Sequence, residues 1–412
     1  MLNNITIFRT LLLLVATSVI VSSCSKDEDN NDSKTTANVV LSGSINANRT
    51  LSADTIYELA GYVVVDSGAT LTINEGTIIK AREGSGAAAS ALIIARGSKI
   101  NAVGTSAKPI IFTSVLDNIT VGQKFGTNLT KDNSSLWGGL ILLGNAKVST
   151  TAADTEGQIE GIPADYTFGL YGGTNDADNS GSLSFVSIRH SGAELKPDQE
   201  LQGLTLGGVG SATTINHVEI FASSDDGIEI FGGAAVLSDI LVVYCQDDAL
   251  DFDQNYSGSI SNFLVIHAGA SAGNAGLEID GPEGSTYTSG KFTLNNGTVK
   301  NPSSASGRAA TLKSAAQGTI NNVAFTGFTN WVSVEGGSAN ANFQSGELEF
   351  TNTQFVKSSI ASTITSSDST LTAALNTILA GGSNTAVTTP TVGATQSVFA
   401  SWTWASNANL LD

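Results

Sequence analysis

Two pairs of neighbouring aspartates are the residues of this sequence with the clearest chemical potential. Asp225 and Asp226 precede Asp247 and Asp248 by 22 residues, and each pair is followed by a short alternation of apolar and polar residues. Paired carboxylates are suited to binding a cation or to sharing acid and base roles in the cleavage of a glycosidic bond. Both uses require the two pairs to lie side by side, so the elements that carry them must bring them together.

A second set of acidic residues shares this spacing. Glu229, Asp251 and Glu278 are the middle residues of three apolar–polar–apolar segments, and Asp253 and Asp280 follow the last two segments. If these segments are adjacent parallel strands about 4.8 Å apart, the three middle carboxylates stack on one another. Stacked carboxylates repel, so we expect them to take up protons or to recruit a cation.

Calcium is the cation that these donors favour, because it takes roughly 6–8 oxygen ligands and accepts carboxylates from neighbouring strands. We predict a Ca²⁺ site with the candidate ligands Asp226, Glu229, Asp248, Asp251, Asp253, Glu278 and Asp280. Neutral residues flank this acidic column, namely Thr205 before it and Thr311 and Ser333 after it. The alternative is a hydrated outer face whose carboxylates repel only weakly, because salt screens them.

The elements that would position these residues belong to an internal repeat. An apolar residue, two variable residues, an apolar or small residue, one variable residue and another apolar residue recur at intervals of 22 to 34 residues, beginning at Leu183, Ile215, Leu237, Ile260, Leu294, Ile320 and Phe350. A second strand of alternating pattern follows most of these segments, as in Leu204–Leu206 and Ile228–Ile230. A short period with variable insertions is typical of the coils of a parallel β-helix.

We therefore predict an all-β chain, a right-handed single-stranded parallel β-helix with capped ends. The expected organisation is a helix over residues 39–360 and a C-terminal capping segment over residues 361–412. The capping segment contains a predicted helix at residues 371–379 and the aromatic residues Trp402 and Trp404. We expect these tryptophans to cover the end of the helix, and sugar binding is the alternative role for them.

The N-terminus has the pattern of a lipoprotein signal peptide over residues 1–23. Its apolar segment, residues 11–21, is too short to span a bilayer and ends just before Cys24, after small residues. This arrangement resembles the bacterial lipobox, which implies lipidation of Cys24. Residues 24–38 are acidic and polar, which predicts a flexible tether. The same run resembles the acidic export signal that directs Bacteroidetes lipoproteins to the cell surface.

Composition limits the classes of partner. The chain has 412 residues and a net charge of −18, which excludes nucleic acid and anionic membrane surfaces as favourable partners. Only three histidines are present, so a histidine-rich zinc site is not expected. The predicted localisation is the outer membrane, where the lipid anchors an otherwise water-soluble domain.

The paired aspartates also resemble the motifs of polygalacturonase-type glycoside hydrolases. In that family, aspartates on neighbouring coils protonate the leaving oxygen and activate water, which would assign catalytic roles here to Asp226, Asp247 and Asp248, with His267 as the accompanying histidine. The glycine residues that flank this histidine in the family are absent around His267, and no arginine–lysine pair for substrate carboxylates is evident. We therefore favour no catalytic residue.

Longer strings resemble a family of β-helical surface lipoproteins from Bacteroidetes and marine bacteria, mostly of unassigned function. They are residues 137–144, residues 159–162, residues 203–210, and the two acidic segments 225–233 and 247–258. This resemblance covers most of the mature chain and implies a β-helix at the cell surface without implying a reaction.

Three functions follow from these observations. The leading hypothesis is a binding scaffold, stiffened by calcium or using it to bridge to a glycan or to an outer-membrane protein partner. The second is a polysaccharide-cleaving enzyme, and the third is an accessory subunit of an outer-membrane transport or secretion complex.

Overall fold

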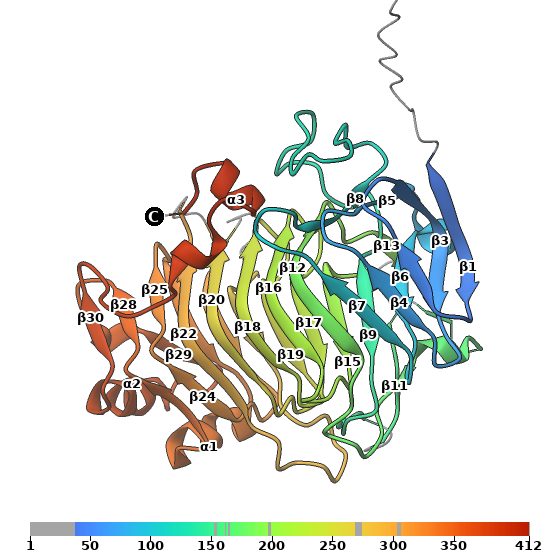
Figure 1. Cartoon of the computed structure of the whole chain (residues 1–412). Coiled ribbons are helices and arrows are strands. Elements are labelled where there is room, and N and C mark those ends of the chain that lie inside the picture. Colours follow the sequence, from blue (N-terminus) through green and yellow to red (C-terminus); the bar gives the residue numbers. More distant parts are fainter. Residues whose placement is uncertain are drawn as a thin grey trace, which may run out of the picture. The chain divides into compact units, whose positions relative to one another are not determined.

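The predicted repeat corresponds to stacked coils of a right-handed parallel β-helix, which confirms the expected fold class (Figure 1). A computed structural model describes residues 38–151, 155–160, 162–163, 165–196, 199–267, 274–302 and 306–411. The predicted signal peptide, Cys24 and nearly all of the tether lie outside these residues. The unit Thr36–Asp412 is compact in itself and contains the strands named below.

Each coil contributes one strand, or one half of a long strand, to each of three faces, which we name A, B and C in chain order. Face A contains β2 (Arg49–Leu51), β4 (Thr70–Ile73), β7 (Lys99–Val103), the first halves of β12 (Gly181–Arg189), β16 (Thr214–Phe221), β18 (Val236–Val243), β20 (Ser259–Ile266) and β22 (Phe292–Lys300), and then β24 (Gly318–Asn321) and β27 (Leu348–Thr351).

Face B follows after a corner within each long strand. It contains the first half of β3 (Ile56–Val65), β5 (Ile78–Ala81), β8 (Ile110–Ser114), the second halves of β12, β16, β18, β20 and β22, and then β25 (Ala324–Thr326), β28 (Gln354–Val356) and β30 (Thr385–Val387).

Face C carries the second strands that the sequence predicts. It contains the second half of β3, then β6 (Ala91–Ile94), β9 (Leu140–Leu143), β15 (Leu204–Gly207), β17 (Ile228–Phe231), β19 (Leu250–Asp253), β21 (Leu277–Ile279), β23 (Arg308–Leu312), β26 (Asn330–Val334) and β29 (Ile364–Ser366). The first strand, β1 (Val39–Ile45), pairs with β3 across the corner between faces B and C.

The inward residues of all three faces form one continuous apolar core. Ile215, Ile220 and Ile228 illustrate the pattern, because each belongs to a different part of one coil and all three are buried in this core. Their alternation with outward residues is the two-residue period of a β-strand. The sequence pattern therefore identified correctly which side of each strand faces the inside of the helix.

Long insertions cover parts of the outer surface. The insertion 144–180 includes the short antiparallel strands β10 (Gly157–Gln158) and β11 (Leu170–Tyr171), and the insertion 190–203 includes β13 (Glu194–Lys196) and β14 (Gln199–Glu200). Together with outward residues of face C they form a second apolar cluster, to which Ile141, Ile159 and Tyr171 belong.

The stacked strands continue beyond residue 360, where we expected the capping segment to begin, because β29 and β30 extend faces C and B. Two helices lie at this end, α1 (Gly337–Ser345) and α2 (Thr372–Gly381), and α2 corresponds to the predicted helix. Phe343 of α1 and Leu375 and Leu379 of α2 join the central core, so these helices close the C-terminal end.

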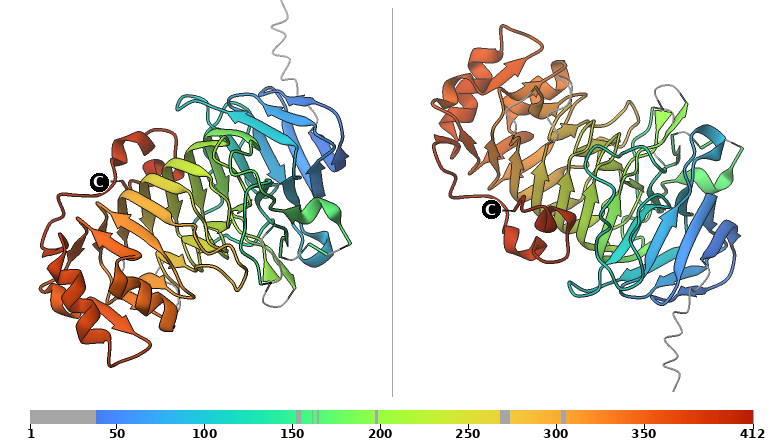
Figure 2. Two further views of the ribbon diagram at one scale, coloured as in Figure 1. Left: turned by 90° about the horizontal axis from the view of Figure 1, so that it is seen from below. Right: turned by 90° about the horizontal axis from the view of Figure 1, so that it is seen from above.

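The aromatic C-terminal segment does not close that end, contrary to our expectation. Residues 394–411, which include α3 (Trp404–Asn407), return along the outside of face B beside the middle coils (Figure 2). Trp402 is fully buried there, and Trp404 stacks on Phe221 with ring centroids 3.9 Å apart. The apolar outward residues of β16, β18 and β20 provide this second surface, which their core-facing pattern does not reveal.

No helix in the described part of the chain is both long and apolar enough to cross a bilayer.

Candidate functional site

The acidic column that the sequence predicts exists on the outer side of face C. Strand pairing aligns Thr205 with Glu229, Glu229 with Asp251, Asp251 with Glu278, and Glu278 with Thr311. Their apolar neighbours face the core, so these middle residues point outward from the helix. The register deduced from the repeat is confirmed.

The column is nevertheless buried rather than hydrated. Glu229 is only 5% exposed and Asp251 9% exposed, because the insertion 144–180 lies over this part of face C. Within that insertion, Tyr171 packs against Phe231 with ring centroids 5.8 Å apart, and its hydroxyl donates to Gln254 Oε1 at 2.9 Å. The alternative of a solvated, weakly repelling face is therefore wrong for these two residues.

Three carboxylates form the innermost group, which we call the inner triad: Asp226, Glu229 and Asp251. One oxygen of each lies within 4.8 Å of the corresponding oxygens of the other two. Among the described residues, neither Glu229 Oε2 nor Asp251 Oδ1 has a hydrogen-bond partner. A buried charged oxygen without a partner is costly, so these atoms need either protons or a cation.

A second group lies toward the surface and shares one residue with the inner triad. Asp225, Asp226 and Asp247 also place carboxylate oxygens within 4.8 Å of one another. Asp225 is half-buried and Asp247 is exposed. Gln202 Nε2 donates to Asp225 Oδ2 at 3.3 Å, so part of this group is held by a neutral partner.

The paired aspartates also have a backbone role. Asp226 Oδ1 accepts the amide N–H of Asp248 at 2.9 Å, and Asp248 Oδ1 accepts the amide N–H of Ala275. Each carboxylate thus binds the turn of the following coil. One carboxylate oxygen of Asp226 and one of Asp248 are therefore committed to the fold, and the second oxygen of each remains for another partner.

Lys313 supplies a cation to the far end of the column. Its ammonium group contacts the Glu278 carboxylate and lies 3.3 Å from Asp280 Oδ2. These two predicted calcium ligands therefore already have a charged partner within the protein. The alignment of Ile279 with Leu312 places Lys313 next to Asp280. The contact between Lys313 and Asp280 could therefore have been predicted from the strand register alone.

Burial and mutual repulsion raise the pKa values of the carboxyl groups in and around the inner triad. Burial raises the pKa values of Asp226, Glu229 and Asp251 well above the usual range, and the neighbouring carboxylates raise them further. The same causes raise the pKa of Asp248 to about 8 and that of Asp253 to about 7. A bound cation would favour the ionised forms instead.

His267, the histidine named for the catalytic alternative, lies outside both carboxylate groups. Its ring packs edge-on against Phe328, with centroids 5.7 Å apart, and lies against Gly307. Burial lowers the pKa of this imidazole. In the described parts of the chain, the candidate metal-binding groups consist of carboxylates alone.

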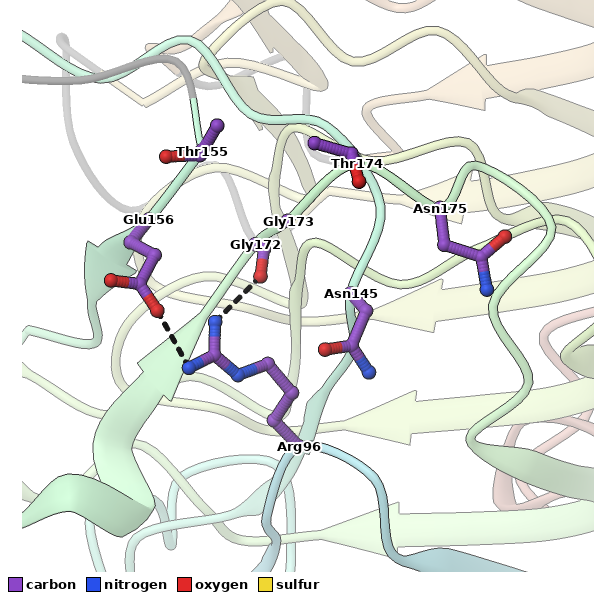
Figure 3. A pocket seen from close by; sticks show the side chains of 8 residues that line it. All are labelled: Arg96, Asn145, Thr155, Glu156, Gly172, Gly173, Thr174 and Asn175. Carbon is purple, nitrogen blue, oxygen red and sulfur yellow. Dashed lines mark hydrogen bonds and ion pairs between the residues drawn. The ribbon is translucent and has the colours of Figure 1, made fainter.

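A separate polar cavity of about 450 Å³ lies beside the insertion (Figure 3). Arg96 donates to the carbonyl of Gly172 at 2.7 Å and pairs with Glu156 at 2.7 Å, while Asn145 and Asn175 line another side (Figure 3). The Arg96 guanidinium is therefore engaged within the protein. The repeat pattern could not have indicated this cavity, because it is formed by an insertion of irregular sequence.

The comparisons with known proteins agree with the fold. A family model described as a pectate-lyase-like β-helix domain matches residues 43–406. The comparison with curated proteins gave no match, and neither did the comparison with solved structures. Since the matched region includes nearly all of the described strands, the chain belongs to the pectate-lyase-like β-helix family.

Proposed function

We propose that this protein is a calcium-stabilised binding scaffold, anchored by lipid at Cys24 to the outer membrane and exposed at the cell surface. The inner triad carries the calcium proposal. Asp226, Glu229 and Asp251 are buried, lie close together, and include two oxygens without a hydrogen-bond partner among the described residues. An all-oxygen, all-anionic donor set favours calcium over softer metals.

The structure narrows the predicted ligand set in this proposal. Glu278 and Asp280 share Lys313, and Asp248 belongs to neither group of closely spaced carboxylates, so we take the inner triad as the principal ligands. Asp253 is half-buried at the edge of the site, where its charge raises the pKa values of both Glu229 and Asp251. Calcium would replace the mutual repulsion of these carboxylates with attraction and so stabilise the contact between two neighbouring coils.

Thermal unfolding of residues 33–412 tests the calcium site. We expect calcium to raise the free energy of unfolding relative to EDTA, by about 2.7 kcal/mol at a hundredfold excess over Kd. Glu229→Gln and Asp251→Asn should abolish this response. In EDTA both variants should be at least as stable as the parent chain, because a neutral amide replaces a buried carboxyl group whose ionised form is unfavourable next to its neighbours.

Glu349→Gln is the matched control, because Glu349 is an exposed residue of β27 far along the chain from the inner triad. Its response to calcium should equal that of the parent chain. An unfolding temperature of the parent chain that calcium leaves unchanged would refute the site.

Lipidation requires a separate test in cells. Incorporation of labelled fatty acid into the full-length chain, and its loss in Cys24→Ala, would support the anchor. Protease accessibility of the domain on intact cells would support surface exposure.

Polysaccharide cleavage is the second candidate function. It is favoured by one observation: exposed Asp247 lies beside buried acids, and the pKa of nearby Asp248 is raised to about 8, so that a protonated carboxyl exists at neutral pH. Glycoside hydrolysis needs one protonated and one ionised carboxyl group, and Asp247, as the more exposed of the two, is the candidate for the ionised group. Release of reducing ends from polysaccharides, abolished in Asp247→Asn, would establish it.

A further inference from the structure

A second carboxylate group connects the buried inner triad to the surface. This outer group consists of Asp225, Asp226 and Asp247, and one carboxylate oxygen of each member lies within 4.8 Å of the corresponding oxygens of the other two. The inner triad has the same close spacing and shares Asp226 with the outer group. Asp226 is therefore a near neighbour both of exposed Asp247 and of buried Asp251.

Exposure falls from the outer group to the inner triad. Asp247 is exposed, Asp225 is half-buried, and the shared residue Asp226 is only 6% exposed. Glu229 and Asp251 are 5% and 9% exposed. A divalent cation that enters at Asp247 thus stays next to carboxylate oxygens while it loses contact with bulk water. This replacement of water by charged ligands offsets the cost of desolvating the ion.

The strands that follow these residues fix their order. Asp225 and Asp226 lie in the turn before β17, and Asp247 lies in the equivalent turn before β19, one coil further on. These two strands pair in register and lie side by side (Figure 1). The outer group is hence at the edge of face C, where the turn from face B ends, and the inner triad extends from that edge onto the face.

The outer side of the inner triad is covered by the insertion 144–180. Tyr171 packs against Phe231 at the end of β17, and its hydroxyl donates to Gln254, which directly follows β19. The amide N–H of Ser149 also donates to the carbonyl of Gln254, at 3.1 Å. The insertion is thus bound to both coils that carry the triad, and a cation leaving on this side has to break these contacts first.

We propose that the outer group is a transient cation site through which calcium enters and leaves the inner triad. This inference rests on the proposed calcium site and deepens it by naming the route by which that site is loaded. Glu229 Oε2 and Asp251 Oδ1, which have no hydrogen-bond partner among the described residues, mark the inner end of the route. Calcium suits such a route because its coordination is flexible, so it can exchange one carboxylate for the next.

The rate of calcium release distinguishes a residue on the route from one that acts only through its charge. Removal of a negative charge off the route weakens the attraction for bound Ca²⁺ and so accelerates release. A charge on the route attracts the departing ion more strongly than the bound ion, because the ion passes next to it. Its removal therefore slows release, and the two effects have opposite signs.

Asp247→Asn and Asp225→Asn are the route variants. Calcium-loaded protein (residues 33–412) is mixed in a stopped-flow instrument with an excess of a fluorescent calcium chelator, and Kd is measured by equilibrium competition with the same chelator. The pH is about 8.5, where Asp225 is ionised although burial raises its pKa to about 7. We expect each route variant to release calcium about fivefold more slowly than the parent chain. The association rate constant, obtained as the release rate divided by Kd, should fall by at least the same factor.

Glu160→Gln is the matched control. Glu160 is an exposed acid of the insertion 144–180 and does not belong to the outer group; its charge, after burial and the nearer carboxylates, raises the pKa of Glu229. This variant should release calcium as fast as the parent chain or faster. Tyr171→Phe, which removes the hydroxyl contact to Gln254, tests the covered side and should leave the release rate unchanged.

Unchanged or accelerated release in both route variants would overturn the inference. Faster release in Tyr171→Phe would also overturn it, because the cation would then leave beneath the insertion. The calcium response in thermal unfolding shows separately that each variant is folded and loaded. A parent chain that binds no calcium would remove the proposed site together with its route, whereas a normal Kd with unchanged release in the route variants would remove the route alone.

Discussion

From residue 185 onward, one left-handed residue makes the corner between faces A and B in each of seven coils. Seven residues at this position have φ between +48° and +58°: Phe185, His217, Asp239, Asn262, Asn296, Asn322 and Asn352. Asparagine and aspartate tolerate this conformation better than other residues with a side chain. Their amides also join neighbouring coils, because Asn322 Nδ2 donates to Asn296 Oδ1 at 2.5 Å and Asn352 Nδ2 donates to Asn322 Oδ1 at 2.8 Å.

We predict that Asn322→Ala lowers the free energy of unfolding by about 2–3 kcal/mol. Roughly 1–2 kcal/mol comes from a left-handed alanine and about 1 kcal/mol from the lost amide contacts. Asn322→Gly should cost less, because glycine adopts the same φ without strain. Denaturant unfolding checks this, and equal losses in the two variants would show that backbone conformation is not the cause.

At the level of elements, the C-terminal segment acts as an external brace for the middle coils. Glu219 on face B accepts the amide N–H groups of Trp404 at 2.9 Å and Ala405 at 3.0 Å. Lys124 Nζ donates to the carbonyl of Ser401 at 2.8 Å. The segment therefore connects an early insertion to later coils, and its tryptophans serve packing.

We predict that Trp402→Ala destabilises the domain by about 3–5 kcal/mol, as expected for truncation of a fully buried aromatic residue. It should also increase binding of an apolar dye, because the outer side of face B becomes exposed. Ser397→Ala, an exposed change in the same segment, is the control. A loss of stability no larger than that of the control would contradict a packing role for Trp402.

At the level of the whole domain, the concentration of acids on one face makes stability depend on pH and on cations. The pKa values of Asp225 and Asp253 are raised to about 7 and that of Asp248 to about 8, with burial as the main cause. In the unfolded chain an aspartate has a pKa of about 3.9. The folded state therefore binds more protons than the unfolded state between these values.

We predict that, in EDTA, the unfolding temperature falls as pH rises from about 4 to about 8. The reason is that stability decreases with pH wherever the native state binds more protons. Scanning calorimetry between pH 5 and pH 9 checks this, and Glu349→Gln should follow the same curve. A rise in unfolding temperature with pH in EDTA would contradict the burial of neutral acids.

The sequence by itself determined the coil architecture and the register of the acidic column. Inward residues such as Leu183 and Ile228 repeat with the period of a strand. When the repeated segments pair in parallel, only one alignment buries all of these residues. That alignment correctly stacked Glu229, Asp251 and Glu278 and brought Asp226 next to Asp248. Local periodicity and strand pairing were sufficient for these features.

The tertiary structure alone decided what lies against the outer surface of the coils. Burial of Glu229 and Asp251 depends on the insertion 144–180, and the placement of Trp402 on face B depends on an apolar surface formed by several coils. Such contacts join segments that are far apart in sequence. They depend on complementary surface shape, which leaves no repeating pattern in the sequence. The sequence therefore determined which carboxylates are neighbours, whereas the covering insertion turned them from a hydrated row into a buried site.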